Sequence, residues 1–140
     1  MVKLKNITLN DRLGLKDGLK YSIEGPVTGI YLNDKVLGYI NYISHSSLKI
    51  IYIDTMELFD QYKGKGYGTL AINELKKMYS DYAIHGQCTP YDNSKNFWEN
   101  QGAIFDSCCS CTEYNICGGD IYNGHCDAPM SYSFEIPNNL

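Results

Sequence analysis

The chain has 140 residues, of which 44% are hydrophobic, and its formal net charge is −4. These values predict a single folded domain over residues 1–140, and they argue against a disordered chain and against nucleic acid as a partner. No apolar run approaches the ~20 residues of a membrane helix, and Met1–Lys5 lacks the apolar core of a signal peptide, so we expect no membrane association and a cytoplasmic protein.

The first part of the chain predicts mainly strands. We expect a strand at Leu4–Leu9, followed by an irregular or helical stretch around Asp11–Lys20. A hairpin should follow, with strands at Thr28–Leu32 and Val36–Ile43 joined by the turn Asn33–Asp34. After a turn at Ser44–Ser47, we expect a further strand within Leu48–Leu58. The last of these segments is rich in Ile, Tyr and Thr, which favour strands.

A glycine-rich turn follows this strand. Residues 60–69 read Asp-Gln-Tyr-Lys-Gly-Lys-Gly-Tyr-Gly-Thr, with alternate glycines at Gly64, Gly66 and Gly68. Glycines let the backbone approach a ligand closely, and amides at a helix start favour an anion. The turn therefore predicts a phosphate or pyrophosphate site. It lacks the lysine that a P-loop has before Thr69, and the looser dinucleotide fingerprint Gly66-x-Gly68-x-x-Ala71 is not followed by a βαβ unit.

The second half of the chain predicts two helices among strands. A first helix has apolar residues at helical spacing from Ile72 to Tyr82. Then we expect a strand at Ala83–Cys88, a short helix capped by Asn93 or Ser94 and ended by Gly102, a strand opening at Ile104, and a last strand at Met130–Ile136. The order of elements predicts an α+β fold.

Two motifs in this order resemble the GNAT family of N-acetyltransferases. Lys63-x-x-Gly66-x-Gly68 resembles the family's Arg/Gln-x-x-Gly-x-Gly/Ala, which Gln61-x-x-Gly64-x-Gly66 also matches. Asn93 to Phe105 resembles the later signature Asn-x-x-Ala-x-x-Phe-Tyr-x-x-x-Gly-Phe, with Ser94 in the Ala position. The resemblance covers roughly residues 28–107, and we prefer the later register of the first motif.

The resemblance implies a mixed, mostly antiparallel twisted sheet flanked by helices, with a shortened N-terminal helical region between Leu9 and Thr28. It also implies that the chain moves an acetyl group from acetyl-CoA to a primary amine by direct attack in a ternary complex. A catalytically silent acyl-CoA-binding or regulatory module is the alternative, and a homodimer stays open. The cofactor-binding positions that the resemblance implies are Leu58, Lys63, Gly64, Lys65, Gly66, Tyr67, Gly68, Thr69, Asn93 and Asn96.

The resemblance also marks catalytic positions on the strand before the turn. Leu58 or its neighbour would offer a backbone amide to the acetyl carbonyl, and Asp54 and Tyr52 occupy the positions of the general base. The period of two places Tyr52 and Asp54 on one strand face and Glu57 on the other. For the general acid, this chain has Phe97-Trp98 where the family often has Phe-Tyr, so Tyr91, Tyr67, water or an unprotonated thiolate would take that part.

Five of the six cysteines lie in one segment, residues 107–129, which we interpret as an insertion before the last strand and a wall of the acceptor site. Cys108, Cys111, Cys117 and Cys126 supply four thiolates, enough for a tetrahedral zinc ion. Disulfides and free thiols are the alternatives, and a metal-stapled interaction protein is a third function. The remaining cysteine, Cys88, and His85 on the same expected strand are expected to be structural.

Overall fold

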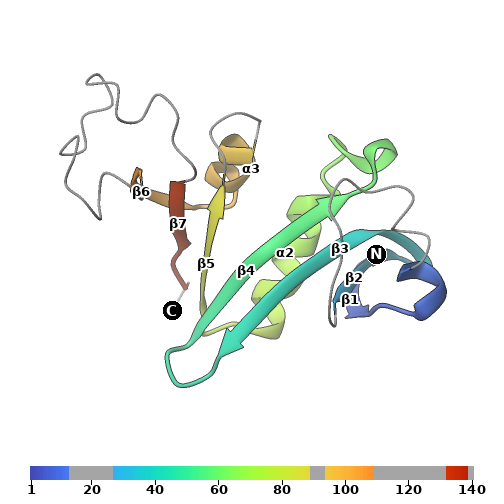
Figure 1. Cartoon of the computed structure of the whole chain (residues 1–140), viewed down its shortest axis with the longest axis horizontal. Coiled ribbons are helices and arrows are strands. Elements are labelled where there is room, and N and C mark those ends of the chain that lie inside the picture. Colours follow the sequence, from blue (N-terminus) through green and yellow to red (C-terminus); the bar gives the residue numbers. More distant parts are fainter. Residues whose placement is uncertain (13–26, 89–93, 109–131, 139–140) are drawn as a thin grey trace. The chain divides into compact units, whose positions relative to one another are not determined.

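The computed structural model describes residues 1–12, 27–88, 94–108 and 132–138 (Figure 1). These residues belong to two compact units, Met1–Tyr82 and Ala83–Leu140. The expectation of one domain over residues 1–140 stays a prediction.

The first unit contains antiparallel strands in the order β1-β2-β3-β4. They are β1 (Val2–Asn6), β2 (Thr28–Leu32), β3 (Lys35–His45) and β4 (Ile50–Leu58). Helix α2 (Tyr67–Met78) lies along these strands (Figure 1) and buries Ala71, Ile72 and Leu75 completely. Because these residues recur at helical spacing, one stripe of the helix meets the apolar face of the sheet.

The first strand ends earlier than the sequence predicted. Its last paired residue is Asn6, whereas the expected strand ran to Leu9. Thr8 explains the difference, because its side chain accepts a hydrogen bond from the Asp11 amide at 3.2 Å and its carbonyl accepts one from the Arg12 amide at 2.9 Å. Thr8 thus starts a helical turn, which leaves Leu9 exposed.

The hairpin β2–β3 is confirmed, with the left-handed Asn33 in its turn. The next hairpin turns later than expected, because β3 continues to His45 and Lys49 adopts a φ of 54° before β4 begins at Ile50. Lys49 also forms an ion pair with Asp81 at 3.2 Å, beyond the end of α2. This hairpin is therefore tied to the C-terminal end of the helix.

A pair of tyrosines makes a second link between β3 and the end of α2. The hydroxyl groups of Tyr42 and Tyr79 lie 3.3 Å apart, and their rings pack edge to face. Burial and the hydrogen bond to Tyr79 raise the pKa of Tyr42 to about 12. Tyr42 therefore stays protonated at neutral pH, and the contact between the two rings helps to hold β3 to the end of α2.

The second unit contains β5 (Ala83–Cys88), α3 (Ser94–Asn100), β6 (Ile104–Cys108) and β7 (Tyr132–Ile136). Strand β7 pairs antiparallel with both β5 and β6. On β5, Nε2 of His85 lies 3.2 Å from Oε1 of the directly opposed Glu135, without the angle of a hydrogen bond. Strand β5 has the predicted bounds, whereas residues 109–131, which hold most of the Cys-rich segment, lie outside the described residues.

The short helix α3 ends as the sequence predicted. Gly102 has a φ of 91°, its amide donates to the Glu99 carbonyl, and the Ala103 amide donates to the Trp98 carbonyl, both at 3.0 Å. These two bonds form a Schellman motif, in which a left-handed glycine closes the helix. Among the residues that the structure describes, no helix is long and apolar enough to cross a membrane.

Trp98 is the centre of the apolar packing in the second unit. Its side chain is 7% exposed, and its ring stacks on Phe134 of β7 with centroids 4.5 Å apart and planes 26° apart. Phe97 packs edge-on against it at 4.8 Å. A large buried aromatic ring of this kind holds its helix to the strands beneath it.

We predict that Trp98→Ala lowers the free energy of unfolding by about 3 kcal/mol, because it leaves a cavity beside Phe134. Urea denaturation followed by circular dichroism measures the change. Asn96→Ala, on the exposed side of the same helix, is the matched control and should change it by less than about 0.5 kcal/mol. Equal losses in the two variants would contradict a packing role for Trp98.

Candidate functional site

The segment between β4 and α2 consists of short hydrogen-bonded turns, and its first residue, Phe59, is hydrogen-bonded to β3. The Phe59 amide donates to the Leu37 carbonyl at 2.9 Å, which holds the end of β4 against β3. A 3-10 helix, η1 (Asp60–Tyr62), follows directly. It is closed by hydrogen bonds from the Tyr62 amide to the Phe59 carbonyl at 2.9 Å and from the Lys63 amide to the Asp60 carbonyl at 3.2 Å.

Two glycines of the turn adopt left-handed backbone conformations. Gly64 and Gly66 have φ values of 74° and 85°, which favour glycine, and a Cβ built on either residue would meet nothing within 4 Å. The two glycines are therefore required by conformation and not by crowding. Space beside the backbone is open to a ligand.

The backbone at the start of α2 has the features of a candidate anion site. Gly66 is the N-cap and provides no side-chain hydrogen bond, and the first helical bond runs from the Leu70 amide to the Gly66 carbonyl at 3.2 Å. The amides of Tyr67 and Gly68 therefore lie outside the helical ladder, and the first turn carries no acidic residue. A helix of 12 residues adds a partial positive charge at this end.

Lysine side chains add to the positive potential of the turn. Lys63 and Lys65 are both exposed, and Nζ of Lys63 lies 2.9 Å from Oδ1 of Asp60. Because solvent screens such an exposed pair, it holds Lys63 only weakly. Both ammonium groups can therefore turn toward a bound phosphate.

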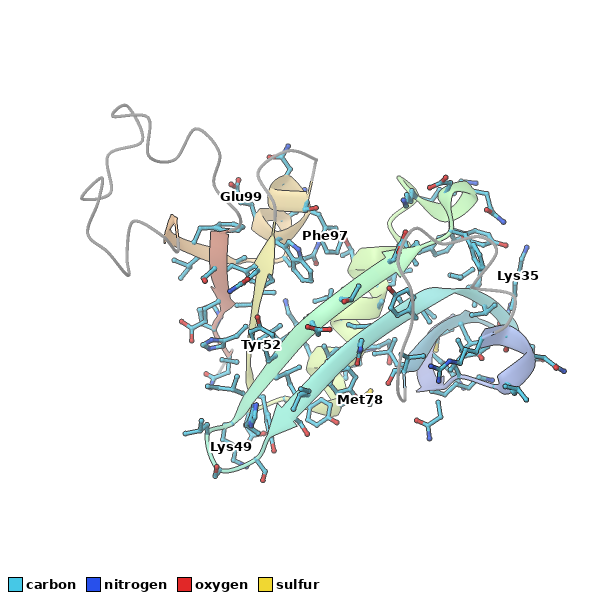
Figure 2. All side chains as sticks on the ribbon, viewed as in Figure 1. Lys35, Lys49, Tyr52, Met78, Phe97 and Glu99 are labelled. Atoms are coloured by element: carbon cyan, nitrogen blue, oxygen red, sulfur yellow. The ribbon has the colours of Figure 1, made fainter. Side chains whose placement is uncertain are left out.

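Aromatic rings pack against one another along the turn, and they contact a lysine that the sequence analysis did not identify. The ring centroid of Tyr62 lies 6.3 Å from that of Phe59 and 6.2 Å from that of Tyr67, and both pairs pack edge to face. Nζ of Lys35, at the start of β3 (Figure 2), lies 5.1 Å from the Tyr62 ring centroid, and a hydrogen bond with Tyr62 raises the pKa of Lys35. No local pattern marks Lys35, because it reaches the turn only through the pairing of β3 with β4.

Asp54 occupies a β-bulge on β4. Tyr42 opposes Ile53 and the adjacent Asn41 opposes Thr55, so Asp54 is the extra residue between two paired positions. Its carboxylate is exposed and accepts a hydrogen bond from Oγ1 of Thr55 at 3.3 Å. Bulges re-aim side chains, and here the bulge presents the candidate base to solvent.

The predicted orientation of Glu57 is wrong, because the bulge at Asp54 interrupts the alternation of side chains along β4. Strict alternation along β4 would place it on the face opposite Tyr52, as we expected from the sequence. In the sheet, Tyr52 opposes Ile43 and Glu57 opposes Tyr39, and these two β3 residues are four positions apart on an uninterrupted stretch. Since opposed residues point to the same face, Tyr52 (Figure 2) and Glu57 share one face of the sheet.

Leu58, the expected source of the backbone amide, is the last residue of β4 and is half-buried. It opposes Gly38 of β3, and its neighbours Glu57 and Phe59 are both attached to β3 as well. The segment that carries this amide is thus held along its whole length.

The remaining predicted site residues belong to the second unit or lie outside the described residues. Asn96 is exposed on α3, whereas Asn93 falls in an undescribed segment. Of the four candidate zinc ligands, Cys111, Cys117 and Cys126 are also undescribed, and only the backbone of Cys108, in β6, is described. The described residues contain no group of three or more metal-ligating side chains, and the zinc site on the cysteines stays a prediction.

Comparison with known proteins gives one family and one fold. Residues 8–103 match the model of the acetyltransferase (GNAT) family. A search of curated proteins found no match.

Solved structures extend the fold over nearly the whole chain. Naa50 of Arabidopsis thaliana, in complex with the bisubstrate analogue CoA-Ac-MVNAL, has a TM-score of 0.64 at 17% identity and covers 96% of this chain and 97% of its own. The ribosomal-protein-S18-alanine N-acetyltransferase of Escherichia coli has a TM-score of 0.64 at 9% identity, with 100% and 96% covered. A streptothricin acetyltransferase of Bacillus anthracis, with acetyl coenzyme A, has a TM-score of 0.59 at 10% identity, with 96% and 97% covered. The expected α+β fold, a mixed and mostly antiparallel sheet flanked by helices, is confirmed.

The anion-site hypothesis predicts that Thr69→Glu lowers affinity for CoA at least tenfold relative to the matched neutral variant Thr69→Gln. A carboxylate in the first turn repels a bound pyrophosphate, while it interacts favourably with the helix dipole, so thermal stability should not fall. Isothermal titration calorimetry with CoA and a melting curve give the two readouts. Equal affinities of the Glu and Gln variants would contradict an anion at this helix start.

Proposed function

The chain belongs to the acetyltransferase (GNAT) family, and from this premise we propose that it acetylates a primary amine by direct attack on acetyl-CoA in a ternary complex. The observation that carries the proposal is the glycine turn between β4 and α2. An uncapped helix start, two left-handed glycines and flanking lysines together offer a site for the pyrophosphate of the coenzyme.

Strand β4 supplies the proposed chemistry. The Leu58 amide donates a hydrogen bond to the thioester carbonyl and stabilises the oxyanion that forms as the amine attacks. Asp54 accepts the proton that the ammonium form of the acceptor loses before attack, either directly or through a water that Tyr52 positions, and the nitrogen releases its second proton to solvent after attack. The tetrahedral intermediate then collapses, the carbon–sulfur bond breaks, and CoA leaves as its thiolate.

The acceptor is proposed to be a cationic amine. Glu57 shares a face with Tyr52, and Asp54 is exposed at the bulge between them, so β4 carries two carboxylates in the stretch before the residue that would hold the acetyl carbonyl. Such a pair attracts an ammonium group before deprotonation. The similar structures include enzymes named for peptide and antibiotic acceptors, and peptide N-termini are therefore the first class to test.

The leaving thiolate needs no acid from α3. Trp98, at the position where the family often has Tyr, is buried against Phe134, and an indole N–H is not a proton donor at neutral pH. A thiol pKa near ~8.5 lets the sulfur leave as the anion and take a proton from water afterwards. Tyr67, half-buried at the start of α2, is the proposed alternative source.

The burial of Trp98 also favours a second candidate function, an acyl-CoA-binding module without turnover. The two functions share the coenzyme site and differ in catalysis. Mixed peptides, polyamines and small amines incubated with acetyl-CoA, with mass spectrometry for products and thiol release for turnover, separate them. Product formation supports the transferase; tight CoA binding with no product and no thiol release supports the silent module, and absence of CoA binding overturns both.

We predict that Asp54→Asn lowers kcat by roughly 100-fold, because the amine loses its proton acceptor. CoA affinity, measured by calorimetry, should stay within twofold of wild type because Asp54 is on the strand and not in the turn. Glu57→Gln is the matched carboxylate-to-amide control, and it should raise the acceptor KM more than it lowers kcat. Wild-type turnover in Asp54→Asn would exclude this residue as the base.

A further inference from the structure

Gly38 of β3 lies directly against the strand end that carries the proposed oxyanion amide. It opposes Leu58 in the β3–β4 register. A Cβ on Gly38 would collide with the backbone carbonyl oxygen of Glu57 and lie 2.7 Å from Cα of Leu58. Ordinary van der Waals contacts of a Cβ fall between 3.4 and 4 Å, so the collision involves main-chain atoms that no rotamer change can move away.

We propose that Gly38 is a positioning residue for acetyl transfer: the absence of a side chain there lets β4 approach β3 closely enough to set the direction of the Leu58 amide. The inference rests on the proposed function, in which this amide binds the acetyl carbonyl. Gly38 itself touches no reacting atom. It acts through the backbone of residues 57 and 58.

The surrounding contacts leave the strand end no other way to adjust. Tyr39, next to Gly38, opposes Glu57, and the Leu37 carbonyl holds the Phe59 amide at 2.9 Å. An added methyl group would therefore push out the middle of a segment whose two ends are attached to β3. The resulting displacement, on the order of 1 Å, is the kind of misplacement that costs catalysis far more than binding.

The coenzyme site should be much less affected. The turn is held by its own contacts, including the hydrogen bonds that close η1 and the packing of Tyr62 against Phe59 and Tyr67. A displaced Leu58 amide with an intact turn predicts a loss in kcat without a comparable change in the KM for acetyl-CoA.

The test uses Gly38→Ala in the full chain, with Gly29→Ala as the matched control. Gly29 lies on β2, and a Cβ there would collide with the ring of Tyr31, a buried side chain, and not with the backbone of β4. Both variants should lose stability. Only Gly38→Ala should lower kcat, by roughly 10- to 100-fold with the KM for acetyl-CoA within twofold, while Gly29→Ala keeps kcat within twofold.

A second measurement reads the amide itself. In protein labelled with 15N-leucine, the Leu58 amide should shift when acetyl-CoA replaces CoA, because only the thioester offers a carbonyl. That acetyl-dependent shift should vanish in Gly38→Ala. If the variant does not fold, a Gly38 Hα to Leu58 Hα nuclear Overhauser effect in the wild-type protein still tests the close approach, and its absence overturns the proposal.

The outcomes separate this inference from the function on which it rests. No acetyl-dependent shift in the wild type would remove the Leu58 assignment, and the role of Gly38 with it. A shift and a kcat that survive in Gly38→Ala would overturn the positioning role and leave the transferase mechanism intact. Equal losses of kcat in Gly38→Ala and Gly29→Ala would reduce Gly38 to a stability residue.

Discussion

The pairing of β3 with β4 is the constraint on which the candidate site depends. Its register runs from His45 opposite Ile50 to Gly38 opposite Leu58, with one bulge at Asp54. This ladder decides which side chains of β4 share a face, holds the strand end through the Phe59 amide, and brings Lys35 to the turn. Because the ladder is made of backbone hydrogen bonds, the site inherits a rigidity that surface side chains alone would not provide.

The coenzyme turn, by contrast, relies little on side-chain identity. Its proposed anion site would consist of backbone amides and the dipole of α2, placed by two glycines with positive φ. Lys63 stands where the family often has arginine, and its ammonium is exposed beside Asp60, a setting in which a single charge contributes little. The substitution is therefore tolerable on physical grounds, because in the proposed site the amides would orient the phosphates and the lysines would only raise the local positive potential.

Local signals predicted much of the fold and the place of the glycine turn between β4 and α2, and long-range strand pairing produced the differences within the candidate site. The glycine turn, the bounds of β5 and the Gly102 helix end are set by residues adjacent in sequence, so they could be read directly. The face of Glu57 could not, since the bulge at Asp54 is defined only by its partner strand. The premature end of β1 had a local cause in Thr8, which the apolar pattern through Leu9 concealed. The contribution of Lys35 depends on the same pairing as the bulge.

The packing of Trp98 bears on which residues carry out the steps of the proposed reaction. A tyrosine there could protonate the leaving sulfur, but the indole is committed to Phe134 and its unit's core. Without an acid at this position, collapse of the intermediate would depend on the sulfur leaving as a thiolate, and the remaining catalytic stabilisation would come from the oxyanion amide and from deprotonation of the amine. Both of these steps are assigned to β4. If no acid acts from this position, turnover should be especially sensitive to the geometry of Leu58 and Asp54, and hence to the bulge and to the side chain that Gly38 lacks.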